Sequence, residues 1–178
     1  RKAAMSSEPQ APRGRLAILH PPGRLALGPN PFGKDVANTQ LWQALARHGG
    51  YARIDMLGLQ AFDASGLTDE LYGDYPRATE IAAGLLTQSQ APLEAGVLLR
   101  GQPELYDLAW HRRRRHSDRA YSLAGLIHTL APPAMRQIIA NTAVAPMHPW
   151  DALICTSRAV RENLEAMFEG WGEHLAER

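Results

Sequence analysis

The sequence lacks several features that characterise other classes of protein. Its 178 residues include one cysteine, Cys155, so no disulfide can form within it, and such sparing use of cysteine is typical of a reducing compartment. No apolar run approaches the ~20 residues that a membrane-spanning helix needs, and no signal-peptide core precedes the first apolar segment. We therefore expect a soluble, cytoplasmic protein.

An excess of charge of one sign is also absent. The 19 basic and 18 acidic residues nearly cancel, so no overall field attracts nucleic acid, and we expect no nucleic-acid partner. The one dense basic run is Arg112, Arg113, Arg114 and Arg115. It has two interpretations. The first is a solvated helix end, where cations suit the helix dipole. The second is a patch that makes peripheral membrane contact or binds an anionic acceptor.

The chain does contain a segment that predicts a strand, a long loop and a helix. Residues 16–19 form a short apolar run typical of a buried strand, and residues 34–47 carry apolar side chains at helical spacing. The loop between them is rich in glycine and proline. Because ligands of open α/β sheets lie beyond the carboxyl ends of the strands, we expect the chemistry near residues 28–35.

Alternating strand and helix patterns continue along the rest of the chain. Further strands are predicted at residues 51–57, 96–99, 120–130 and 152–156, and helices at 67–72, 76–88, after Pro103, after Pro132 and after Ser157. Five strands with helices between most of them predict an α/β fold of three layers. Its sheet is mostly parallel, and helices cover both faces.

Two more candidate site residues follow predicted strands. His128 lies at the end of an otherwise apolar strand, and Ser157 begins the helix behind the last strand. A lone histidine on an apolar strand is either structural or, at a carboxyl end, a ligand contact. Ser157 is either a helix cap or a ligand contact. With the loop at residues 28–35, these residues predict one convergent site.

The loop also contains a near match to the phosphate-loop motif. Residues 28–35 read Gly-Pro-Asn-Pro-Phe-Gly-Lys-Asp and fit the motif except at Asp35, where a Ser or Thr should bind magnesium. Pro29 and Pro31 have no N–H to offer a phosphate. A nucleotide hydrolase is therefore a less favoured alternative. No histidine or cysteine spacing indicates a metal site, so we expect no metal and no cofactor.

In these same segments the chain resembles the amino-terminal, acceptor-side domain of retaining glycosyltransferases with two Rossmann-like halves, the GT-B type of the large glycosyltransferase family 4. The matching features, in order, are the first strand with its loop, the helix from Gly33 to Arg47, the strand ending in His128, and the strand and helix at residues 151–160. The resemblance implies a Rossmann-like domain of a hexosyltransferase.

The resemblance also implies roles for individual residues. His128 matches a catalytic-cleft histidine that lies against the donor sugar. Gly33, Lys34, Asn38 and Ser157 match positions that bind the donor or the acceptor. The substrates would be a nucleotide sugar and an unknown acceptor hydroxyl. A carboxyl-terminal domain would supply most donor contacts, so we expect this fragment to be inactive alone.

Three expectations about organisation complete the prediction. Residues 1–14 read as a flexible leader, 15–170 as the Rossmann-like domain, and 171–178 as the start of a truncated segment. An alternative of a different class is a non-catalytic Rossmann-like binding module.

Overall fold

The computed structural model describes residues 13–20 and 32–178. Part of the loop expected to carry chemistry, residues 28–31, and most of the expected leader lie outside the described residues. The described elements are β1 (Arg13–Leu19), α1 (Gly33–His48), β2 (Tyr51–Gly58), α2 (Leu67–Tyr72), β3 (Glu80–Leu85), η1 (Leu86–Gln88), α3 (Ala91–Ala95), β4 (Val97–Arg100), α4 (Tyr106–Arg115), β5 (Ser122–Ile127), α5 (Ala134–Val144), β6 (Ala152–Cys155) and α6 (Arg158–Ala176).

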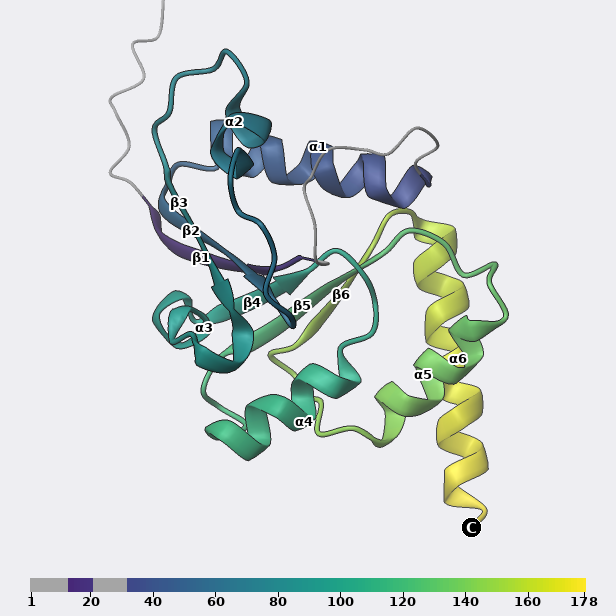
Figure 1. The fold of residues 1–178 in the computed structure, drawn as a ribbon. Helices are drawn as coiled ribbons and strands as arrows, with labels where there is room; N and C mark the ends of the chain where they lie inside the picture. The colour runs from purple at the N-terminus through teal and green to yellow at the C-terminus, as the bar shows by residue number, and fades with distance from the viewer. Residues whose placement is uncertain (1–12, 21–31) are drawn as a thin grey trace, which may run out of the picture.

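The strands form one parallel sheet in the order β3-β2-β1-β4-β5-β6 (Figure 1). The chain builds outward from β1 to β3 on one side, then crosses over and builds outward from β4 to β6 on the other. The direction of building therefore reverses between β1 and β4. This is the order of a doubly wound, Rossmann-like α/β domain, and it confirms the predicted fold class.

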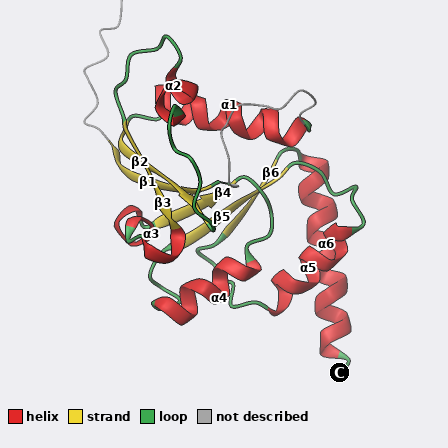
Figure 2. Cartoon of the chain, in the orientation of Figure 1, coloured by secondary structure: helices red, strands yellow, loops and turns green. Residues whose placement is uncertain are grey.

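Helices cover both faces of this sheet because alternate strand residues are apolar on each side (Figure 2). One core lies under α1 and α2 and contains Trp42 and Tyr72 beside Ile18 and Ile54. On the opposite face, α3 and α4 pack on a second core, and α5 and α6 pack on a third around Ile127. The three-layer arrangement follows from this burial on both faces.

The predicted helix at residues 76–88 is wrong, because this segment contains β3 and the short η1 turn. Thr79 fixes the start of the strand: its N–H donates to the Tyr72 hydroxyl at 2.8 Å, and its Oγ1 donates to Tyr51 O at 2.7 Å. From Glu80 onward the backbone then pairs in parallel with β2. Tertiary hydrogen bonds to the edge of the sheet override the helical spacing of the apolar residues.

Arg112 is not solvated, contrary to one of the two interpretations of the basic run at residues 112–115. Its side chain is completely buried and forms a two-pronged ion pair with Asp151, with Nη1–Oδ1 at 2.6 Å and Nη2–Oδ2 at 2.9 Å. Neither the solvated-end interpretation nor a membrane-contacting patch can include Arg112. Arg113 instead pairs with Asp118, while Arg114 and Arg115 are exposed.

Within the described residues, no helix is both long enough and apolar enough to cross a bilayer.

Candidate functional site

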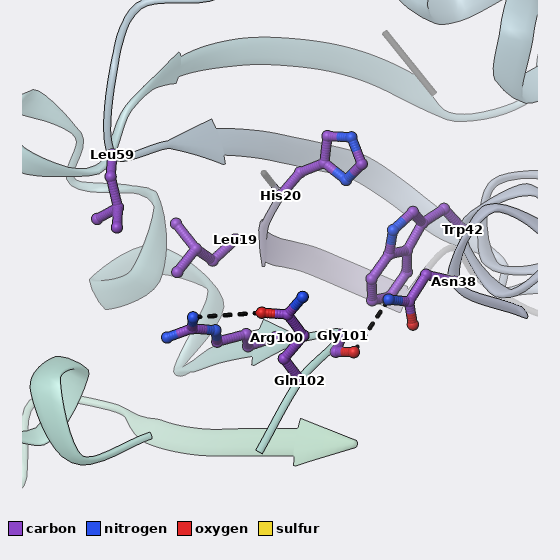
Figure 3. Close-up of a pocket in the computed structure, with 8 residues that line it drawn as sticks. All are labelled: Leu19, His20, Asn38, Trp42, Leu59, Arg100, Gly101 and Gln102. Atoms are coloured by element: carbon purple, nitrogen blue, oxygen red, sulfur yellow. Dashed lines mark hydrogen bonds between the residues drawn. The ribbon is translucent and has the colours of Figure 1, made fainter. Parts of the chain in front are cut away.

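A cavity of about 220 Å³ lies at the carboxyl ends of β1 and β4, where the strand order reverses (Figure 3). Strand ends, the segments that follow them and α1 contribute its walls. The described lining residues are Leu19, His20, Asn38, Trp42, Leu59, Arg100, Gly101 and Gln102. In doubly wound sheets this switch point is the usual ligand site, because the two adjacent connections leave in opposite directions and open a crevice.

Asn38 and His128 meet at one edge of this cavity, although 90 residues separate them in the chain. Asn38 is buried on α1, and its Nδ2 donates to Gly101 O at 2.9 Å. His128, directly after β5, places Nε2 at 3.0 Å from Asn38 Oδ1 and 3.1 Å from Gly101 O. Both partners are acceptors, so Nε2 carries the hydrogen. In the neutral ring Nδ1 then holds the lone pair.

Gly101 makes this meeting sterically feasible. A Cβ at this position would lie 2.5 Å from Asn38 Nδ2 and 2.6 Å from its Cγ, closer than atoms can approach. The absence of a side chain thus lets the carbonyl of residue 101 bind both Asn38 and His128.

Arg100 brings a positive charge to the cavity, and its own neighbours offset that charge. Nη1 donates to Glu104 O at 2.6 Å, and Nη2 lies 3.7 Å from Glu104 Oε2. Nη2 also lies 3.5 Å from Gln102 Oε1. The wall formed after β4 is therefore polar without a large net charge.

The other predicted site residues lie at helix starts. Gly33 and Lys34 are exposed in the first turn of α1, where the Asp35 N–H already donates to Phe32 O at 2.9 Å. Ser157 is the N-cap of α6, and its Oγ accepts from Val160 N at 3.2 Å, which confirms the cap interpretation. Among the described residues that line the cavity, none of these three appears.

Sequence reasoning missed His20, Trp42, Arg100, Gly101 and Gln102. Four of them are at or just beyond the ends of β1 and β4. The available signal was strand order: once β1 and β4 are known to be neighbours, the residues that end them must share one crevice. Trp42 carried no such signal, since an aromatic residue on the inner side of a helix is usually core.

Within residues 13–20 and 32–178, no group of three or more His, Cys, Asp or Glu side chains is arranged to hold a metal ion. Comparisons with protein-family models, curated proteins and solved structures found no match to this chain. The functional argument therefore rests on the cavity and its residues.

Proposed function

We propose that this chain is the acceptor-side domain of a glycosyltransferase and that it binds a hydroxyl-bearing substrate in the cavity between β1 and β4. The observation that carries the proposal is the position of His128. Its Nε2 is held by Asn38 and Gly101, at the carboxyl ends of strands on the side of the sheet where the cavity opens. The resemblance seen in the sequence supplies the reaction type.

In this proposal His128 lies beside the cavity, against its Asn38 and Gly101 wall, and contacts a part of the sugar that extends beyond the cavity. With Nε2–H directed at Asn38 and Gly101, the lone pair on Nδ1 is the group that can accept a hydrogen bond from a sugar hydroxyl. Asn38 acts by positioning the imidazole. Glycosyl transfer depends mainly on orienting two substrates and stabilising the departing diphosphate, so this domain needs no nucleophile of its own.

Lys34 and Gly33 take a secondary role in the proposal. Both are exposed at the amino end of α1, where the partial positive charge of the helix and the ammonium group favour a phosphate. They would contact the diphosphate of the nucleotide sugar, whose other contacts would come from a second domain.

A non-catalytic binding module is the second candidate. The observation that favours it is that residues of this chain suffice to form the cavity. It differs from the first proposal in predicting no contact with the donor, so binding of an acceptor sugar would be insensitive to nucleotide.

Saturation-transfer NMR with the whole chain tests the proposal. The probes are a panel of monosaccharides and disaccharides, UDP-glucose, GDP-mannose and ATP. We expect sugars to bind with millimolar affinity, and Asn38→Ala to abolish the signal. Asn163→Ala, which changes an exposed residue on α6, should leave it intact. Circular dichroism of each variant checks the fold.

Three results would count against the glycosyltransferase proposal. Sugars that give no signal with the unaltered chain would remove the acceptor role. ATP binding that is tighter than sugar binding and is lost in Lys34→Ala would instead favour the nucleotide-hydrolase alternative. Sugar binding that added UDP-glucose leaves unchanged would favour the non-catalytic module.

A further inference from the structure

Two buried nitrogens at the cavity have no hydrogen-bond partner among the described residues: Trp42 Nε1 and His20 Nδ1. Both residues line the cavity, and the Trp42 side chain is only 1% exposed. Figure 3 shows the indole nitrogen of Trp42 and a ring nitrogen of His20 on the edges of their rings that face each other. Buried polar atoms in proteins are nearly always paired with protein groups, water or a ligand, so two unpaired nitrogens at one cavity indicate that hydrogen-bonding groups of water or a ligand occupy it.

The chemistry of the two nitrogens restricts the ligand group. Indole N–H is a donor only, whereas a neutral imidazole nitrogen is a donor or an acceptor according to its tautomer. Burial lowers the pKa of His20 from its ordinary value of 6.5, so the ring is mostly neutral at pH 7. A hydroxyl accepts from Trp42 and can either donate to or accept from His20. It therefore satisfies both nitrogens in either tautomer, while a carboxylate oxygen only accepts and satisfies His20 only when Nδ1 carries the hydrogen.

The size and charge of the cavity restrict the ligand further. Its volume of about 220 Å³ is below the ~300–1,000 Å³ of pockets for drug-sized ligands. Arg100 is offset by Glu104, so the described lining of the cavity offers no uncompensated cation to a phosphate. Leu19 and Leu59 add apolar wall on the side away from Trp42, as Figure 3 shows, which suits the C–H faces of a small ring.

We propose that this cavity binds an uncharged, hydroxyl-bearing ring of monosaccharide or cyclic-polyol size, whose hydroxyl groups pair with Trp42 Nε1 and His20 Nδ1. The inference rests on the proposed function only in taking this ring to be the acceptor. It deepens that function by assigning two specificity-determining residues and by predicting that the cavity prefers an uncharged acceptor to an anionic one.

The test is a titration followed by the indole N–H resonances of the isotope-labelled chain. The chain has four tryptophans, so Trp42→Phe identifies the resonance of Trp42 by its loss. The probes are D-glucose, myo-inositol and inorganic phosphate. We expect glucose or inositol to shift the Trp42 resonance selectively and phosphate to leave it in place.

Two variants distinguish the contribution of the hydrogen bonds to ligand binding from that of side-chain packing. Trp42→Phe keeps a ring but removes the donor, and His20→Leu removes the second partner. Loss of either neutral hydrogen bond should weaken binding of the responding probe roughly three- to tenfold. Trp110→Phe, at a 40% exposed position on α4, is the matched control and should bind like the unaltered chain.

If only phosphate shifts the Trp42 resonance, the proposal that the ligand is uncharged is wrong. If no probe shifts it, the proposal that this cavity is a binding site is wrong. If sugars bind without moving it and bind equally to Trp42→Phe, this inference fails while the proposed function stands. If inositol moves it but the sugar panel of the preceding section gives no signal, the site stands and the glycosyltransferase proposal fails.

Discussion

Replacing Arg112 with methionine removes one half of a fully buried ion pair and leaves the other half in place. The Arg112 guanidinium also donates to Tyr121 O at 2.7 Å and to Pro146 O at 3.2 Å. Its partner Asp151 further accepts from Leu123 N at 2.8 Å and His148 N at 2.9 Å. The pair thus joins the end of α4 to the segments that lead into β5 and β6.

The expected loss of stability follows from the charge that remains. In Arg112→Met the Asp151 carboxylate keeps its two backbone donors but loses its counter-ion, and two carbonyls lose their donor. Removing one partner of a buried ion pair costs about 3–5 kcal/mol. Domains are stable by only about 5–15 kcal/mol, so much of the total would be lost. With a urea dependence of about 2 kcal/mol per molar, the unfolding midpoint should fall by about 2 M.

Urea unfolding followed by circular dichroism measures the change. Arg114→Met, two positions further along the same helix and exposed, is the matched control and should alter the free energy of unfolding by less than about 0.5 kcal/mol. The reasoning is refuted if Arg112→Met unfolds at the same urea concentration as Arg114→Met. Arg112→Lys keeps the positive charge but loses the planar guanidinium that makes two parallel hydrogen bonds. Its urea midpoint should therefore lie between those of Arg112→Met and Arg114→Met.

Two further predictions concern a glycine and a carboxylate. Gly101→Ala should displace Asn38 and abolish sugar binding while the fold persists, whereas Gly84→Ala, where an added Cβ would meet its nearest atom at 3.9 Å, should bind normally. Equal binding by both variants, measured by the same saturation-transfer NMR, would contradict the steric argument. The hydrogen bond from Arg113, followed by that from His148, lowers the pKa of Asp118 to about 2. Because the folded pKa is below the ordinary 3.8, the stabilisation is complete above pH 4 and is lost as pH falls toward 2. Arg113→Leu should move the Asp118 pKa, followed by carboxyl-carbon NMR, back toward 3.8; a pKa that stays near 2 in this variant would show that Arg113 is not what lowers it.

Local pattern was sufficient for much of the fold. The apolar runs that became β1, β4, β5 and β6 are short and bounded by turn-forming residues, so their character did not depend on distant contacts. The position of His128 after β5 and the Ser157 cap were predicted for the same reason. The strand at residues 80–85 was missed because its conformation depends on pairing with β2 and on the hydrogen bond from Thr79 N–H to the Tyr72 hydroxyl.

The cavity could not be predicted from local sequence patterns. Its walls come from β1, α1 and the segment after β4, which are far apart in the chain, and only the strand order places them together. Arg112 shows the same dependence, since its burial requires a partner 39 residues away.

By itself, the sequence determined the class of fold, most of the strands and helices, and the placement of one histidine at a strand end, because hydrophobic periodicity and turn chemistry act over a few residues. The tertiary structure alone decided which strands are neighbours, that Asn38 meets His128 across Gly101, and that Trp42 and His20 present unpaired nitrogens to one cavity. Those features depend on long-range pairing of backbone and side chains, which no local pattern encodes.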